Sequence, residues 1–138
     1  MIDNITQPFI VTHTIPSRLY ASDGTTLKQL GFRYSAYQIV NNVDGDKMFA
    51  YFTCKGNETL AYLRHYKDSN SGIFDLYINN VLDSSGYDEY AAVGVSSSLK
   101  ITLTQLIKKG LNTIEFRVNG KNASSSAYKI TIGSMLVQ

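Results

Sequence analysis

Short runs in which apolar and polar residues alternate constrain the fold of this 138-residue chain more than any other feature. Residues 112–118 show the pattern most clearly, because Ile114, Phe116 and Val118 alternate with polar residues. Successive side chains of a β-strand point to opposite faces, so this run predicts a strand with one buried face. Similar runs predict strands at residues 9–15, 32–40, 47–53, 59–66, 73–79, 90–95, 98–104, 112–118 and 128–138.

Clusters rich in Gly, Asn, Asp and Ser separate these runs. Many short strands punctuated in this way predict an all-β protein, with antiparallel strands arranged as a sandwich or a barrel. Within residues 112–118 the outward face is predicted to carry Thr113, Glu115 and Arg117. The predicted core contains Ile114, Phe116, Val118, Tyr128, Ile130, Ile132, Phe74, Leu76, Ile78, Leu99, Ile101 and Leu103.

The last two runs raise two local questions. Gly133 breaks the alternation, because Met135 and Val137 rejoin the apolar face only if a β-bulge adds a residue there. Residues 119–127 between the runs are rich in Asn and Ser, and we expect the flanking strands to meet across them as a hairpin. Polar side chains of such a loop most simply satisfy backbone groups at a corner of the sandwich, and a binding surface is the second possibility.

The first part of the chain reads differently from the rest. Residues 1–30 contain both prolines and a single convincing strand, so we expect an N-terminal arm that docks on a neighbour. Residues 31–138 are then predicted to form one β-sandwich domain, which is an ordinary size for a single core.

Charge and composition exclude several classes of partner. The net charge of +2 is the difference between 13 basic and 11 acidic residues, and Lys108 and Lys109 are the only adjacent basic pair, so no nucleic-acid partner is expected. No apolar run approaches the roughly 20 residues of a membrane span, and the N-terminus lacks the apolar core of a signal peptide, so no membrane partner is expected. A single cysteine allows no intramolecular disulfide.

Catalysis has little support in the sequence. His13 and His65 lie in separate predicted strands without metal-binding spacing, and a structural histidine with a satisfied or exposed ring is the better interpretation of each. No nucleophile or phosphate-loop motif is present. Isolated acids could in principle form a glycosidase pair, but acids in strands and turns are usually solvated. We therefore predict a protein that is not an enzyme and has no cofactor; the acids considered are Asp75, Asp83, Asp88 and Glu89.

One turn offers a weak candidate metal site. Asp68, Asn70 and Asp75 surround a glycine, and together with Ser71 they supply oxygen ligands of the kind that calcium accepts. The order of an EF-hand loop is absent. A polar turn whose Asn and Asp side chains cap their own backbone is the better interpretation, so no metal site is predicted.

The tyrosines give the stronger indication of binding. Two segments, residues 62–68 and 86–94, place tyrosines beside charged side chains. Aromatic rings next to carboxylates and guanidinium groups suit the C–H patches and hydroxyls of a sugar, and they also suit a hydrated protein interface or an ordinary surface. The residues predicted as a glycan site are Tyr62, Arg64, Tyr66, Tyr87, Asp88 and Tyr90.

Three motifs occur in a particular order along residues 47–138: FAYFTCKGNETLAYL, SGIFDLYINN and KKGLNTIEFRVNGKNASSSAYKITIGSMLV. This order resembles the galactose-binding-domain-like jelly-roll modules that occur in bacteriophage tail and head proteins and as appendages of bacterial glycoside hydrolases. The chain departs from that pattern at Asn80, Asn112 and Ala127, where the family usually has Gly, His and Gly. The resemblance implies a non-catalytic sandwich whose loops and edges bind glycans or attach the module to a virion or a partner domain.

Two functions follow from the resemblance. The first is a bacteriophage virion structural protein, either a capsid decoration protein or a small fibre subunit, assembled in the host cytoplasm. It would form homo-oligomers and contact capsid or tail proteins. The second is a lectin-like module that binds a cell-surface glycan for host adhesion or substrate targeting.

Overall fold

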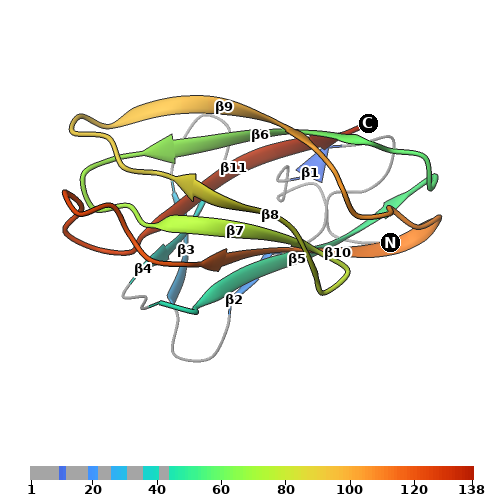
Figure 1. Cartoon of the computed structure of the whole chain (residues 1–138), viewed down its shortest axis with the longest axis horizontal. Coiled ribbons are helices and arrows are strands. Elements are labelled where there is room, and N and C mark those ends of the chain that lie inside the picture. Colours follow the sequence, from blue (N-terminus) through green and yellow to red (C-terminus); the bar gives the residue numbers. More distant parts are fainter. Residues whose placement is uncertain (1–9, 12–18, 22–25, 31–35, 41–43) are drawn as a thin grey trace.

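The computed structural model describes residues 10–11, 19–21, 26–30, 36–40 and 44–138. They form two sheets packed face to face as a β-sandwich (Figure 1), so the predicted all-β architecture is confirmed. The six-stranded sheet has the order β3 (Thr26–Leu30), β4 (Ala36–Val40), β11 (Ile130–Val137), β6 (Leu60–Lys67) and β9 (Val95–Thr102), and β1 (Ile10–Val11) also pairs with β11. The five-stranded sheet has the order β2 (Leu19–Ala21), β5 (Lys47–Cys54), β10 (Gly110–Val118), β7 (Ile73–Ile78) and β8 (Val81–Asp88).

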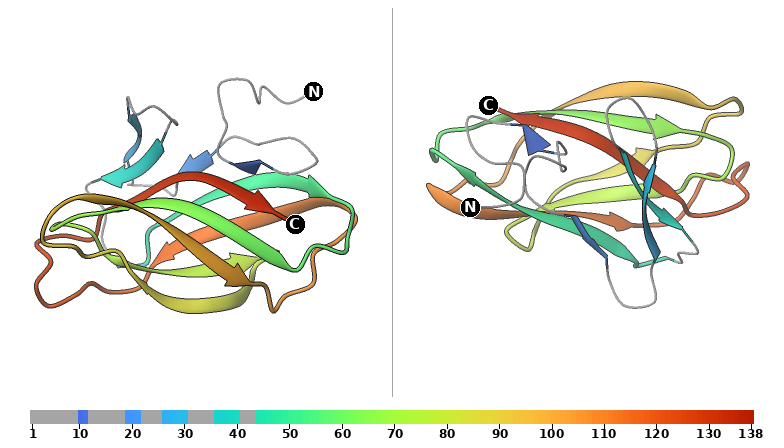
Figure 2. Two further views of the ribbon diagram at one scale, coloured as in Figure 1. Left: turned by 90° about the horizontal axis from the view of Figure 1, so that it is seen from above. Right: turned by 180° about the vertical axis from the view of Figure 1, so that it is seen from behind.

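Neighbouring strands within both sheets are antiparallel, except that β1 runs parallel to β11. Figure 2 shows the same arrangement from above and from behind. In the part of the chain that the structure describes, no helix has the length and apolar character needed to cross a membrane.

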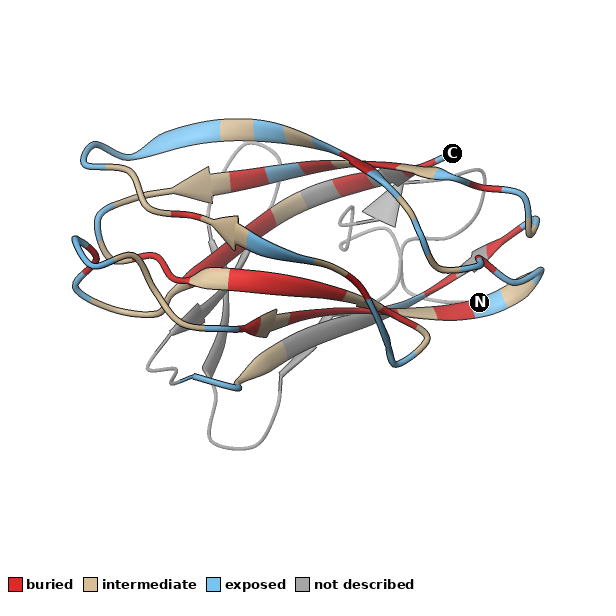
Figure 3. Ribbon diagram, viewed as in Figure 1, coloured by how far each residue is buried: buried red, intermediate tan, exposed pale blue. Residues whose placement is uncertain are grey.

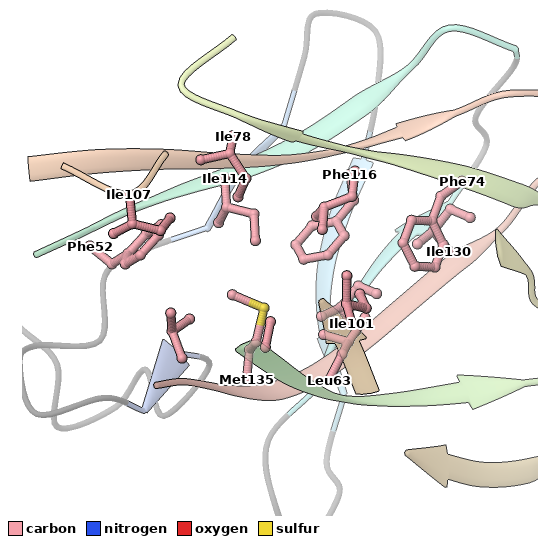
Figure 4. Close-up of a cluster of buried hydrophobic side chains, with 14 of the residues drawn as sticks. Phe52, Leu63, Phe74, Ile78, Ile101, Ile107, Ile114, Phe116, Ile130 and Met135 are labelled. Carbon is pink, nitrogen blue, oxygen red and sulfur yellow. The ribbon is translucent and has the colours of Figure 1, made fainter. Parts of the chain in front are cut away.

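The core lies between the two sheets and is built from the predicted alternating positions (Figure 4). Phe74 and Phe116 are fully buried and meet edge to face, with ring centroids 5.5 Å apart. Leu99, Leu103 and Tyr128 are partly buried against the same cluster, and the other predicted core residues are buried. The hydrophobic alternation therefore predicted the inward faces of β7, β9, β10 and β11 correctly.

The bulge predicted near the end of the chain is present. The pairing of β11 with β6 shifts register between Ile132 and Met135, and both Met135 and Val137 are buried. A Cβ atom at Gly133 would lie 3.3 Å from the carbonyl oxygen of Arg64, which is closer than most such contacts. The absence of a side chain at Gly133 therefore suits the shifted strand.

The loops gather at the two ends of the sandwich. Residues 68–72, 89–94 and 119–129 connect strands at one end, on the left of Figure 1, which we call the Ser-loop end. Residues 55–59, 79–80 and 103–109 connect strands at the opposite end, which we call the Lys-loop end.

The sequence prediction was wrong for residues 81–95. Residues 79–86 were expected as a turn, but most of them belong to the edge strand β8. Residues 90–95 were expected as a strand, but residues 90–94 lie in a loop that crosses from one sheet to the other. Asn79 and Asn80 both have positive φ, 49° and 68°, which suits the tight turn of a hairpin joining β7 to β8. Strand β8 has little apolar alternation because it lies at a sheet edge, so the pattern did not reveal it.

The expected hairpin between the last two strands was also wrong. Strand β10 belongs to the five-stranded sheet and β11 to the six-stranded sheet, so residues 119–129 cross between the sheets. The polar side chains there do satisfy backbone groups at a corner, as predicted. The buried hydroxyl of Ser125 donates to the carbonyl of Ser71 at 2.6 Å, and the Ser126 amide donates to the carbonyl of Ser69 at 3.0 Å.

We expect Ser125→Ala to lower the free energy of unfolding by about 1–3 kcal/mol, because it leaves a buried carbonyl without its hydroxyl partner. Ser124 is the matched control, since its side chain is exposed and only its backbone amide bonds, to Asn122. Urea denaturation of both variants checks this. Equal losses in the two variants would contradict the assigned role of the Ser125 hydroxyl.

Most of residues 1–30 lie outside the described residues. The described parts are β1, β2 and β3, which pair with β11, β5 and β4 respectively. That this segment is a docking arm, and that the domain begins at residue 31, remain predictions from the sequence.

Candidate functional site

Three of the predicted glycan-site residues share one face of β6. Tyr62, Arg64 and Tyr66 point away from the core, because the alternating Ala61 and Leu63 are buried. A Cβ atom at Gly94 would overlap the Tyr66 hydroxyl, so the loop of residues 89–94 closes against this ring. The register of β6 with β9 places opposite them, in order, Lys100, Ser98 and Ser96.

The other three predicted residues lie elsewhere. The Tyr87 ring packs on the core, 5.1 Å from the ring of Phe74. The Asp88 carboxylate accepts from the Tyr90 amide at 2.9 Å and from the Asn122 side chain at 2.7 Å, at the Ser-loop end. Tyr87 and Asp88 do not share the outer face of β6, because β6 and β8 belong to different sheets, whereas Tyr90 follows β8 and bridges to Asp68 just past the end of β6.

The acids considered for catalysis are occupied by structural bonds. The Asp83 carboxylate accepts from the amides of Thr104 and Gln105 at 2.6 and 2.9 Å. The Asp75 carboxylate accepts from the Gly86 amide and the Asn119 side chain at 2.9 and 2.8 Å. The expectation of solvated acids was wrong for Asp75, Asp83 and Glu89, which are all buried, because Asp75 and Asp83 accept from backbone amides and Glu89 bonds to His65.

His65 has the satisfied structural environment expected of it. Its Nδ1 atom lies 2.6 Å from Oε2 of Glu89, and both side chains are buried. Burial raises the pKa of Glu89, and the bond and charge of His65 partly oppose that effect. The pair fastens the loop that begins at residue 89 to β6. The other histidine, His13, lies outside the described residues.

The candidate metal ligands are not brought together. The Asp68 carboxylate accepts from the Ser71 hydroxyl at 2.6 Å and forms an ion pair with Lys129, whereas Asp75 has the separate partners given above. Asn70 donates its amide to Asp68 at 3.3 Å, as in a capped turn. Within the described ranges no three His, Cys, Asp or Glu side chains are grouped as metal ligands.

Cys54 has the environment of a structural thiol. It is buried beside Glu58, and burial together with that carboxylate raises the pKa of the thiol to about 12. A thiol that stays protonated at neutral pH is a poor nucleophile and a poor metal ligand.

A pocket of about 230 Å³ lies on the outer face of the five-stranded sheet. Strand β10 supplies Thr113 and Glu115, which the sequence pattern had placed on the outward face. Strand β5 supplies Lys47 and Tyr51, and the turn between β7 and β8 supplies Asn80. The pocket exists because three neighbouring elements of one sheet present polar and aromatic groups toward the same side.

An ion-pair network fixes the acid of this pocket. Arg117 Nε lies 2.6 Å from Oε2 of Glu115, and Lys47 Nζ lies 3.8 Å from its Oε1. The Arg117 guanidinium stacks 4.0 Å from the centroid of the Tyr77 ring. The hydrogen bond to Glu115 raises the pKa of Arg117, so this guanidinium stays charged at any ordinary pH. Glu115 is thus a positioned acceptor at the edge of an aromatic surface.

The chemistry of the face suits a small neutral ligand with several hydroxyl groups. Two cations, Lys47 and Arg117, are balanced by two carboxylates, Glu115 and Asp75, so the face has no strong net charge. Tyr51 offers an aromatic ring, the amide and hydroxyl groups can both donate and accept, and the carboxylate accepts. The volume lies below the roughly 300–1,000 Å³ of sites for drug-sized ligands, so it fits one ring of a longer chain.

Only part of this face could be predicted from the sequence. The alternating pattern placed Thr113, Glu115 and Arg117 on one outward face. It did not predict them as a binding site, because their neighbours across the sheet were unknown. Tyr51 lies in β5 and Tyr77 in β7, both far from Glu115 in the sequence, and the strand order β5-β10-β7 brings them beside it.

No family model matches the chain, and no curated protein matches it. Solved structures do share its fold. A xanthan lyase from Paenibacillus aligns with a TM-score of 0.68 at 21% identity, over 88% of this chain and 12% of the lyase. The chain thus corresponds to a small part of that enzyme.

Two smaller proteins align over most of their own length. The CBM36-1 domain of a multidomain xylanase from the hindgut metagenome of Trinervitermes trinervoides gives a TM-score of 0.58 at 14% identity, over 88% of this chain and 96% of that domain. CsCBM6-3 from Clostridium stercorarium, solved in complex with cellobiose, gives 0.56 at 9% identity, over 88% and 86%. The chain has the galactose-binding-domain-like jelly-roll fold that the sequence resemblance implied.

Proposed function

We propose that this protein is a non-enzymatic carbohydrate-binding module that binds a neutral glycan on the outer face of its five-stranded sheet. The observation that carries the proposal is the pocket beside Tyr51, with Glu115 held in place by Lys47 and Arg117. The fold supports it, because solved carbohydrate-binding modules share the fold.

The pocket residues have distinct roles in this proposal. The Tyr51 ring packs against the C–H face of a sugar, which needs an exposed aromatic surface. Glu115 accepts hydrogen bonds from sugar hydroxyls, and Asn80 and Thr113 donate or accept at the rim. Arg117 stacks on Tyr77 and bonds to Glu115, so it holds the Glu115 carboxylate in one orientation. Binding then costs little side-chain entropy at Glu115.

The other functional predictions from the sequence rank second. Tyr62, Arg64 and Tyr66 remain an alternative glycan surface on the six-stranded sheet. The virion hypothesis, with its capsid or tail partners, its homo-oligomer and its location on a phage particle, has no support among these comparisons and stays a prediction from the sequence.

Tyr51→Ala tests the proposal against the alternative surface. We expect it to weaken affinity for the best-bound polysaccharide about tenfold or more, because the ring is lost while the strand pairing remains. Tyr62→Ala is the matched control, since it also removes an outward-facing tyrosine from a strand. Affinity electrophoresis against a panel of neutral and acidic polysaccharides, followed by calorimetry on the best ligand, measures both variants.

The outcome distinguishes the two faces. Loss of binding in the Tyr62 variant with full binding in the Tyr51 variant would move the site to the six-stranded sheet. Failure of the unaltered protein to bind any polysaccharide saturably would remove the proposal altogether.

A further inference from the structure

The Lys-loop end of the sandwich is built as one rigid surface. The Asp83 carboxylate holds the amides of Thr104 and Gln105, and Gln105 Nε2 donates to the Leu82 carbonyl at 3.1 Å. The buried Asn112 side chain bonds to the Lys108 amide and carbonyl at 2.8 and 2.9 Å. The Asn79 side chain donates to Oδ1 of Asn112 at 3.0 Å, so the turn at residues 79–80 is joined through Asn112 to the loop at residues 103–109.

The third loop of this end is fixed in the same way. The buried Glu58 carboxylate accepts from the amides of Lys55, Gly56 and Asn57 at 2.9, 2.9 and 3.1 Å. A Cβ atom at Gly56 would lie 2.9 Å from the Lys109 amide nitrogen, so the loops at residues 55–59 and 103–109 touch.

This fixed end presents large apolar side chains to solvent. Leu106 is 78% exposed, although the adjacent Ile107 is anchored in the core. Leu111 is 56% exposed, and Val81 and Leu82 are 52% and 45% exposed. Exposed aliphatic side chains grouped on a structured surface mark a contact site more often than scattered ones do.

The exposed charged side chains of the three loops at this end have one sign. Lys55, Lys108 and Lys109 are exposed, whereas the acids Glu58 and Asp83 are buried and bonded to backbone amides. Among the described residues, the exposed charged side chains of these three loops are therefore all positive. Figure 3 shows exposed residues at this end of the sandwich, beyond the buried strands.

We infer that the Lys-loop end docks onto an anionic lipid surface, with Leu106 and Leu111 entering the headgroup region and the three lysines facing lipid phosphates. The lysines suit the negatively charged headgroups of such a surface, and the exposed aliphatic residues suit the apolar region beneath them. A second copy of this end would repel the first through its lysines, and an acidic polysaccharide would leave the leucines in water. No membrane partner was expected from the sequence, because it has no apolar run long enough to span a membrane. A peripheral contact needs no such run, so that expectation does not argue against this one.

Vesicle sedimentation tests this inference independently of glycan binding. We expect about tenfold or more protein to sediment with vesicles containing phosphatidylglycerol than with pure phosphatidylcholine, and added salt to reduce the difference. Leu106→Asp should abolish sedimentation, and the double substitution Lys108→Gln and Lys109→Gln should weaken it. Val93→Asp is the matched control, because Val93 is an aliphatic residue that is 81% exposed at the Ser-loop end.

Three results would overturn the inference. The first is equal sedimentation with anionic and neutral vesicles, and the second is an equal loss of sedimentation in the Leu106→Asp and Val93→Asp variants. The third is self-association without lipid that Leu106→Asp removes, because this end would then be an interface between copies. Thermal melting of each variant confirms that it is folded. Glycan titration of the same variants separates failure here from failure of the proposed glycan site.

Discussion

Phe116→Ala should lower the free energy of unfolding by about 3–5 kcal/mol, which few domains of this size can spare. The Phe116 ring is fully buried, packs against Phe74 and faces a core to which both sheets contribute. Alanine would remove this buried surface and leave a cavity that the two sheets can close only partly. Urea or thermal denaturation of the variant measures the loss.

Leu111→Ala provides the matched control for that measurement. Leu111 lies on the same strand, β10, but is exposed, so its truncation should change stability by no more than about 0.5 kcal/mol. Similar losses in the two variants would contradict the assignment of Phe116 to the core between the sheets.

His65→Ala should destabilise the protein by about 3–5 kcal/mol at neutral pH, because it leaves the buried Glu89 carboxylate without its hydrogen-bond partner. The loss should shrink in acid, where Glu89 can be protonated. Chemical denaturation of the variant and the unaltered protein at several pH values checks both parts.

The direction of the pH dependence follows from the pKa of Glu89. Burial raises that pKa above the ordinary value. Between the ordinary and the raised pKa, the folded protein therefore holds a proton on Glu89 that the unfolded chain has released. The contribution of Glu89 to stability is therefore lost as pH rises from the ordinary glutamate value through the raised one. Lys67 lowers the pKa and Asp88 raises it, and both act less than burial.

Removing His65 removes a favourable charge and hydrogen bond, so it raises the pKa of Glu89 further and extends that pH window upward. His65→Gln is the control, because its amide can still donate to Glu89, and it should lose less stability. A deficit of His65→Ala that stays constant with pH would show that Glu89 does not titrate in the way described.

The sequence predicted the fold where the alternating pattern is strong. Strands β6, β7 and β10 were placed to within a few residues, because each has one buried apolar face. Strand β8 was missed because an edge strand with exposed Val81 and Leu82 has no such pattern. The hairpin expected around the Ser-rich loop was wrong because alternation gives the faces of a strand but not the sheet to which it belongs.

The same limit explains the candidate site. Tyr87 and Asp88 are adjacent in the sequence and were therefore predicted in one glycan site, but their side chains point in different directions. In contrast, Tyr51 and Glu115 are far apart in sequence and meet because β5 pairs with β10. Pairing between distant strands was the information that the sequence alone did not contain.

The most direct test of the glycan-binding account is a titration of the isotope-labelled protein with the best-bound oligosaccharide, followed by NMR spectra of the backbone amides. The account predicts saturable shifts that cluster at Tyr51, Asn80, Thr113 and Glu115 on the outer face of the five-stranded sheet. Saturable shifts confined to the outer face of β6 or to the Ser-loop end, or no saturable shift with any glycan, would contradict it.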